Sequence, residues 1–276
     1  MLIIFKAIII AIVEGITEFL PISSTGHMIL VGDLIKFNGS DFSDMYEVVI
    51  QLGAILAVVV LYWAKIREMI VSFFKFEKKG IRFWLNIIVA TIPAMIMGFA
   101  LNKIIKQYLF NSKTVIIGFV VGGILLIVIE NNFRKRENSN TVVRKLEDIS
   151  YGQAFKVGLF QCLAMWPGMS RSASTIMGGW VAGLSTTVAT EFSFFLAIPV
   201  MIGASGLELK KFDFSSVAAN EKIALAVGFI VAFITALLVV DRFIAFLKKK
   251  PMRTFAIYRL SVAAIFIILV ALNVIK

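Results

Sequence analysis

The chain has 276 residues, 59% of them hydrophobic, and a mean hydropathy of +0.92. A water-soluble domain is nearer half apolar, so the excess indicates a second apolar environment, which a lipid bilayer supplies. The net charge of +11 would suggest nucleic acid in a soluble protein, but here Lys and Arg form short runs between apolar stretches, as membrane topology requires. We therefore expect membrane lipids, and no nucleic acid, as partners. Cys162 is the only cysteine, which excludes an intramolecular disulfide and a cysteine-based metal site.

The first apolar region, residues 2–36, is interrupted by Pro21-Ile22-Ser23-Ser24-Thr25-Gly26-His27. Its arms are short for membrane spans, so we predict a re-entrant hairpin of two half-helices, buried in protein or lining a wet cavity. The first thirteen residues resemble part of a signal peptide. Glu14 and Glu18 follow at once, however, and no small-residue cleavage pattern is visible, so we expect them to stay in the mature protein. Three predicted membrane-spanning helices follow, at 47–63, 83–101 and 114–130.

The same order recurs in the second half of the chain. Residues 151–184 form another interrupted apolar region, broken by Pro167-Gly168-Met169-Ser170-Arg171-Ser172, and three spans are predicted at 186–206, 223–240 and 254–275. Because three spans per half is an odd number, the second half should be inverted relative to the first. We therefore predict a single all-α integral membrane domain over residues 1–276. It comprises a first repeat at 1–133, a basic cytoplasmic linker at 134–149 and a second, inverted repeat at 150–276. Hairpin arms that cross the membrane completely remain an alternative.

The distribution of basic residues predicts the orientation. The loops 62–82, 134–150 and 242–253 carry 16 Lys and Arg residues, whereas the loops on the opposite side carry six. Positive loops face the cytoplasm, so both termini should lie outside. The first hairpin then enters from outside and the second from the cytoplasm, which allows their tips to meet near the middle of the membrane. Gly118, Gly122 and Gly123 predict close helix packing.

The first break is preceded by two carboxylates. Glu14 and Glu18 are four residues apart, so on a helix they share one face, one turn from each other. Carboxylates within an apolar segment are costly and usually functional, and a cation between two of them would relieve their repulsion. Oxygen ligands suit Mg²⁺ or Ca²⁺. His27, the only histidine, closes the same run. We expect the hydroxyls of Ser23 and Thr25 in this run to bind substrate. The alternatives are a wet interface for the carboxylates, a packing role for His27 and helix capping by Ser23, Ser24 and Thr25.

The second break carries the features of an anion site. Arg171 is the only charged residue between Lys156 and Glu191, and its guanidinium offers a planar fork of donors that suits phosphate oxygens. Pro167-Gly168 would start a new half-helix, whose N-terminal N–H groups favour anions. Further donors are the hydroxyls of Ser170, Ser172, Ser174 and Thr175. The alternative is an internal salt bridge from Arg171 to Glu14, Glu18 or Glu191, which would not exclude phosphate binding.

Together the two breaks predict a diphosphate site at membrane depth, and therefore a substrate with a lipid tail. The motifs resemble those of the bacterial undecaprenyl-diphosphate phosphatases of the bacitracin-resistance type. The resemblance is very close over E-G-x-T-E-F-x-P-x-S-S-T-G-H at 14–27 and P-G-x-S-R-S-x-x-T at 167–175. It extends over most of the chain, including 47–53, 161–167, 191–195 and 255–259.

This resemblance implies removal of the terminal phosphate of a C55 isoprenoid diphosphate, in the cell membrane, to regenerate the carrier of cell-wall precursors. It also implies two inverted repeats, an active site open to the extracytoplasmic side and dependence on a divalent metal. Glu14 and Glu18 would hold the metal or position water, and Arg171 would bind phosphate. His27 would act as base, acid or nucleophile. Ser24, Ser170 and Thr175 would bind phosphate oxygens, while water, Ser24 and His27 all remain candidate nucleophiles. A homodimer is open on the grounds of the resemblance alone.

A transporter or flippase of isoprenoid phosphates is the main alternative function, because inverted repeats with broken helices at the midplane are a transporter arrangement. Paired carboxylates with a histidine favour hydrolysis, since transport needs only reversible binding. A non-catalytic lipid-binding scaffold is a third reading, but it leaves so many polar groups at membrane depth unexplained.

Overall fold

The computed structural model describes residues 1–134, 136–137, 139–247 and 251–272. Within these residues, six helices are long and apolar enough to cross a membrane. The spanning helices coincide with the six predicted spans and extend most of them by a few residues: α3 (Asp41–Leu61), α5 (Lys78–Tyr108), α6 (Ser112–Arg134), α9 (Thr186–Leu209), α10 (Ala219–Leu247) and α11 (Arg253–Ala271). The chain is therefore an all-α, multi-pass membrane protein. Four of the basic residues used to predict orientation, Lys135 and Lys248 to Lys250, lie outside the described residues, as do 138 and 273–276.

Both interrupted regions consist of a helix, a break and a second helix. The first contains α1 (Leu2–Thr17) and α2 (Ser24–Ile35). The second contains α7 (Tyr151–Gln161), a 3-10 turn (Cys162–Met165) and α8 (Arg171–Val181). At 1.5 Å per residue, α1 is about 24 Å long and the other three are about 16 to 18 Å, which is less than the ~30 Å of a hydrocarbon core. All four arms are thus shorter than the hydrocarbon core, and α2, α7 and α8 are little more than half its thickness.

The second arm of each pair begins at a serine with the same unusual backbone. Ser23 and Ser170 both have φ of 72°, a left-handed conformation that is uncommon for residues with a side chain. Each hydroxyl accepts a hydrogen bond from the backbone N–H three residues later, that of Gly26 at 3.4 Å or Ala173 at 3.2 Å. The capping bond satisfies one of the free N–H groups at the start of each helix. The serines expected to bind substrate therefore also shape the two breaks.

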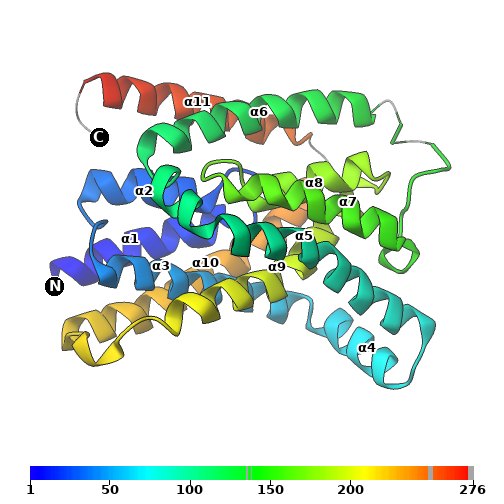
Figure 1. Ribbon diagram of the computed structural model, residues 1–276, viewed down its shortest axis with the longest axis horizontal. Coiled ribbons are helices and arrows are strands. Elements are labelled where there is room, and N and C mark those ends of the chain that lie inside the picture. Colours follow the sequence, from blue (N-terminus) through cyan, green and yellow to red (C-terminus); the bar gives the residue numbers. More distant parts are fainter. Residues whose placement is uncertain (135, 138, 248–250, 273–276) are drawn as a thin grey trace.

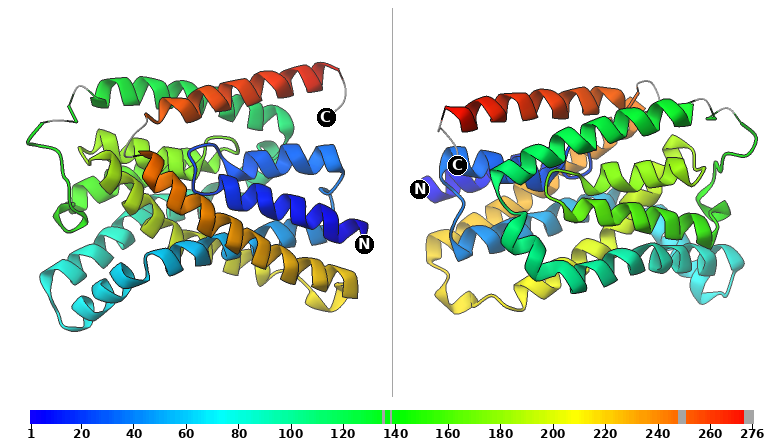
Figure 2. Two further views of the ribbon diagram at one scale, coloured as in Figure 1. Left: turned by 180° about the vertical axis from the view of Figure 1, so that it is seen from behind. Right: turned by 45° about the horizontal axis from the view of Figure 1, so that its top comes forward.

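The helices are arranged so that each first arm packs on the other half of the chain. α1 lies along α10, whereas α7 lies along α5, and α3 packs on both α9 and α10. α6 and α11 run side by side along one edge, as all the views show (Figures 1 and 2). The start of α1 and the end of α11 lie at the same end of the molecule (Figure 1). This arrangement leaves the two breaks facing each other in the interior.

One helix was not separated in the sequence-based prediction. Within the basic loop 62–82 the structure has α4 (Trp63–Phe74), which packs on α5 through its buried residues Ile66 and Met69. The linker that follows α6 is anchored to α5, because Asn86 donates to Ile149 O at 2.8 Å and Arg82 donates to the same oxygen. Short 3-10 turns at Leu146–Asp148 and Phe214–Ser216 complete the described secondary structure.

Candidate active site

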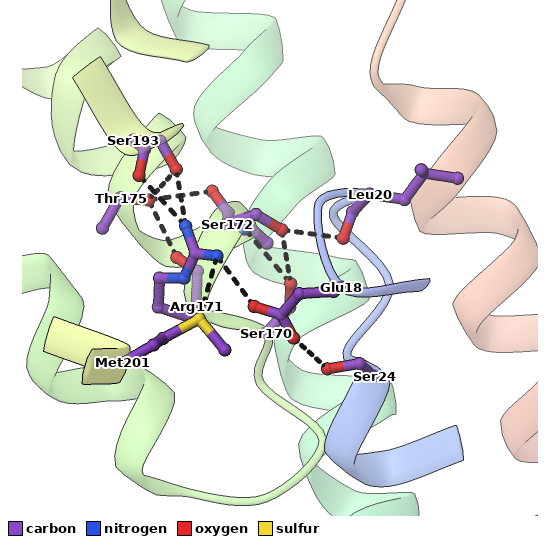
Figure 3. Close-up of polar contacts among 10 residues, drawn as sticks. Glu18, Leu20, Ser24, Ser170, Arg171, Ser172, Thr175, Ser193 and Met201 are labelled. Carbon is purple, nitrogen blue, oxygen red and sulfur yellow. Dashed lines mark hydrogen bonds and ion pairs between the residues drawn. The ribbon is translucent and has the colours of Figure 1, made fainter. Parts of the chain in front are cut away.

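Arg171 and Glu18 join the two breaks. Arg171 Nη2 donates to Glu18 Oε1 at 2.8 Å, and the two side chains are only 14% and 6% exposed (Figure 3). Arg171 is the first residue of α8, and Glu18 is the residue that follows α1. A second contact supports the first, because Ser172 Oγ donates to Leu20 O at 2.7 Å. The predicted meeting of the two tips is therefore present in the structure.

Glu18 also receives a hydrogen bond from its own hairpin. Ser24 Oγ donates to Glu18 Oε2, the carboxylate oxygen that Arg171 leaves free (Figure 3). Ser24 is the first residue of α2, so its hydroxyl lies at a helix N-terminus. One carboxylate is thus held between a guanidinium and a hydroxyl. A site of this kind can bind an anion through Arg171 and take a proton from a nucleophile through Glu18.

Arg171 also contacts Ser193 on α9. Arg171 Nη1 donates to Ser193 O at 3.0 Å and contacts Ser193 Oγ at 3.4 Å. Thr175 Oγ1 donates to the same Ser193 Oγ at 2.7 Å. Glu191 on this span is one of three carboxylates considered as an ion-pair partner of Arg171. Arg171 donates hydrogen bonds to Ser193, two residues later on the same helix. A two-residue difference on a helix turns a side chain through about 200°, which the sequence pattern alone could not settle.

The other predicted hydroxyl residues divide between the two breaks. Ser170 Oγ and Ser172 Oγ are 3.0 Å apart. Ser174 Oγ donates to Ser170 O at 2.8 Å, and Thr175 Oγ1 also contacts Arg171 O at 2.9 Å. Thr25 is partly exposed in the first turn of α2, beside the buried Ser23 and Ser24. Two of these hydroxyls, those of Ser174 and Thr175, therefore bind backbone carbonyls of their own helix start in this structure.

Glu14 is buried, and neither of its carboxyl oxygens has a hydrogen-bond partner among the described residues. The neighbouring carboxyl groups include those of Glu18 and Glu47. Orphaned carboxylate oxygens beside a second carboxylate fit a hard cation. Across the described residues, no three His, Cys, Asp or Glu side chains gather as a metal-binding group. A cation held by Glu14 and Glu18 would thus take its remaining ligands from substrate oxygens and water, as Mg²⁺ commonly does.

His27 lies in the same hairpin but bonds to other groups. Its Nδ1 is 2.8 Å from Ser23 O, and its Nε2 is 3.0 Å from the hydroxyl of Tyr258 on α11. The ring also packs edge-on against Phe119, with centroids 5.1 Å apart. Tyr258 on the last helix thus helps to position His27. The sequence patterns did not predict this contact.

Arg259, next to Tyr258, is the other residue that sequence reasoning missed. It is fully buried, and its Nη2 donates to Gly168 O at 2.7 Å and Gly118 O at 3.0 Å. Glycines on α6 make room for these contacts, because a Cβ on Gly118 would lie 2.3 Å from Pro167 O and one on Gly122 2.0 Å from Arg259 Nη2. Its position inside an apolar span is the sequence feature by which Arg259 could have been identified as a candidate functional residue.

Comparison with known proteins identifies relatives over the whole chain and a matching family. The chain is 60% identical over its whole length to the undecaprenyl-diphosphatase of Clostridium perfringens (strain 13 / Type A), and the alignment covers 98% of that relative. It is 58% identical to the undecaprenyl-diphosphatase of Clostridium tetani, and the alignment covers 100% of this chain and 99% of the relative. It is 55% identical to undecaprenyl-diphosphatase 2 of Clostridioides difficile, with 99% of this chain and 97% of the relative aligned. The family model for bacitracin resistance protein BacA matches residues 7–265. The chain therefore belongs to the BacA family.

Proposed function

We propose that this protein hydrolyses undecaprenyl diphosphate to undecaprenyl phosphate and inorganic phosphate, which recycles a lipid carrier of cell-wall synthesis. The observation that carries the proposal is the buried contact between Arg171 and Glu18, with Ser24 on the other carboxylate oxygen. It places an anion-binding guanidinium, a proton acceptor and a hydroxyl at one point, where the breaks of two apolar hairpins meet. The names of the relatives support the same substrate.

Different groups at the two breaks would carry out the separate tasks of phosphoryl transfer, which are charge neutralisation and proton transfer. Arg171 and the N-termini of α2 and α8 would neutralise the phosphate oxygens, which is the main requirement of this reaction. Attack on the terminal phosphorus forms one P–O bond and breaks the bond to the bridging oxygen, which leaves with undecaprenyl phosphate. Glu18 is placed to accept the proton of the attacking group. Attack by water gives inorganic phosphate directly, whereas attack by Ser24 gives a phosphoserine that a water molecule must then hydrolyse to release the phosphate. His27 would supply a proton through Nε2.

We propose that Glu14 and Glu18 hold a divalent cation, Mg²⁺ or Ca²⁺. The support is the pair of unpartnered Glu14 oxygens beside Glu18. When bound, the ion would add positive charge for the diphosphate oxygens. Substrate that brings its own phosphate to Arg171 would release Glu18 from the ion pair and free its oxygens for the cation.

The isoprenoid chain needs an apolar surface next to the polar breaks. A cavity of about 330 Å³ between α5, α6 and the 3-10 turn of the second hairpin is lined by apolar side chains, among them Leu101, Ile117 and Met165. Met169, which also lines it, directly precedes Ser170. The cavity thus borders the second break, and we assign it to the part of the lipid tail nearest the diphosphate.

The inverted repeat and the orientation are further proposals. A pseudo-two-fold arrangement accounts for two hairpins whose first arms each pack on the opposite half. A Cβ on Gly15 of α1 would lie 2.8 Å from Ala232 O on α10, and one on Gly158 of α7 would lie 2.4 Å from Ala90 O on α5. The shared left-handed serines at the two breaks support the same relationship. We further propose that both termini lie outside the cell and that the active site opens to that side. The even number of spans and the charge of the loops support this orientation.

The proposal is tested by phosphate release from a C15 or C55 isoprenyl diphosphate, using purified protein in detergent, with and without EDTA. We expect metal-dependent release that is lost in Glu18→Gln and Arg171→Ala and kept in Arg67→Ala, which changes an exposed arginine on α4. A folded wild-type protein that releases no phosphate with any divalent metal or chain length would favour transport of isoprenoid phosphates. Uptake by sealed vesicles would then be measured with the same variants.

A further inference from the structure

Tyr258 contacts the only histidine of the chain from the opposite end of the sequence. Its hydroxyl is 3.0 Å from His27 Nε2, and its ring stacks on the imidazole with an angle of 9° between the planes. Tyr258 is 43% exposed, whereas His27 is 7% exposed. The tyrosine therefore lies between a buried imidazole and the surface of the protein.

The two hydrogen bonds of His27 determine which ring nitrogen carries the proton. Ser23 O is a carbonyl oxygen and can only accept, so Nδ1, at 2.8 Å, must be the N–H donor. In the neutral ring Nε2 is then the unprotonated nitrogen, and the hydroxyl of Tyr258 donates to it. A hydroxyl can also accept, so the same partner serves the protonated ring. Nε2 is therefore the atom through which His27 can gain or lose a proton.

The position of Tyr258 is fixed by the neighbouring residue. Arg259 holds α11 to the second break through Gly168 O at 2.7 Å, while Tyr258 reaches the first hairpin. Two consecutive residues of the last helix thus contact both breaks. Phe119 packs against the imidazole edge and restricts the ring further.

We propose that Tyr258 is a positioning residue for His27. Ser23 O fixes the Nδ1–H tautomer, and the hydroxyl and ring of Tyr258 hold the orientation of the imidazole, with Nε2 as the site of proton exchange. Tyr258 acts through His27, and among the described residues no hydrogen bond or ring contact joins it to Arg171 or Glu18. Groups that fix the orientation and tautomer of a functional histidine typically contribute about 10- to 100-fold to activity. The kinetic part of this inference rests on the proposed phosphatase activity, whereas the structural part does not.

The tautomer can be read directly, because His27 is the only histidine. Protein carrying ¹⁵N-histidine and a tag without histidine should give one pair of imidazole nitrogen signals. We expect a protonated Nδ1 and an unprotonated Nε2 in wild type, a changed Nε2 shift in Tyr258→Phe, and no change in Tyr108→Phe, an exposed tyrosine on α5. A wild-type protein with the proton on Nε2, or an Nε2 signal unaffected by Tyr258→Phe, would overturn the proposal even if no phosphatase activity were found.

Kinetics then separate positioning from general support of the fold. Tyr258→Phe should lower kcat about 10- to 100-fold with KM within about twofold, because the interaction is needed in the transition state and not for binding. The same substitution in a His27→Ala background should have no further effect, since the tyrosine acts through the histidine. Equal losses in both backgrounds, or a loss explained by a lower melting temperature, would mean that Tyr258 has only a structural role.

Discussion

Arg171 and Glu18 are separated by 153 positions in the sequence, yet their side chains form a 2.8 Å ion pair where two helix breaks meet. Each residue is next to a helix end, so neither could reach the other unless both hairpins entered the interior of the bundle. The pair therefore serves as a single point from which the candidate site can be tested.

Removing one member of this pair should destabilise the protein. Arg171→Met leaves Glu18 as a buried, unpaired carboxylate, which typically costs about 3 to 5 kcal/mol. Adding Glu18→Gln should recover part of the lost stability, while phosphatase activity stays absent in both proteins. Thermal unfolding in detergent measures the effect, and a double variant less stable than Arg171→Met would contradict the pairing.

Ser193 should contribute to the site through Arg171 and Thr175. Ser193→Ala removes the hydroxyl that accepts from Thr175 but keeps the carbonyl that accepts from Arg171. The loss of one hydrogen bond, about 0.5 to 1.5 kcal/mol, corresponds to a 2- to 10-fold lower kcat/KM. Ser205→Ala, at a buried serine of the same helix, is the matched control. Equal kcat/KM values for the two variants would remove Ser193 from the site.

Gly118 should be sensitive to the addition of a single methyl group. In Gly118→Ala the Cβ would lie 2.3 Å from Pro167 O, so the break that positions Arg171 must shift. Overpacking of this kind costs about 1 to 3 kcal/mol, and we expect lower activity as well. Gly203→Ala on α9 has open space around its Cβ and should be neutral or slightly stabilising. Melting temperatures and phosphate release would be compared, and wild-type behaviour of Gly118→Ala would argue against the tight contact.

Filling the apolar cavity should weaken binding of every isoprenyl diphosphate. Leu101→Trp places a large ring in the cavity assigned to the tail segment nearest the diphosphate. C15 and C55 substrates share this segment, so we expect a higher KM than in wild type for both. Ile96→Trp, at an exposed position on the same helix, controls for the added tryptophan. An unchanged KM for both chain lengths in Leu101→Trp would place the tail elsewhere.

The linker after α6 should show a pH-dependent contribution to stability. Lys65 Nζ lies 2.7 Å from Glu147 Oε1, and this hydrogen bond holds the pKa of Glu147 below its usual 4.5. A lowered folded-state pKa stabilises the protein above pH 4.5, and the contribution is lost as the pH falls further. Wild type should exceed Glu147→Gln by about 0.2 to 1 kcal/mol at pH 7, as for most exposed pairs. Unfolding at pH 7 and at pH values below 4.5 tests this, and a difference that grows on acidification would contradict it.

The membrane spans, the two breaks and the residue types that gather at the breaks could be predicted from the sequence alone. Apolar length predicts a membrane helix, and Pro with small polar residues predicts an interruption, because both effects depend on neighbours along the chain. Local sequence also identified the candidate site residues, because each lies in or beside an interruption of an apolar segment. These residues are Glu14, Glu18, Ser24, His27 and Arg171.

The contacts among these candidate site residues depend on the tertiary structure and could not be predicted from the sequence. Three carboxylates were candidates for Arg171, and the packing of the hairpins selects Glu18 while α9 adds Ser193. Tyr258 reaches His27 across 231 positions, and Arg259 reaches Gly168 across 91. Such contacts depend on the rotation and crossing of whole helices, which are set by close packing at positions such as Gly118 and Gly122 and which no local pattern encodes.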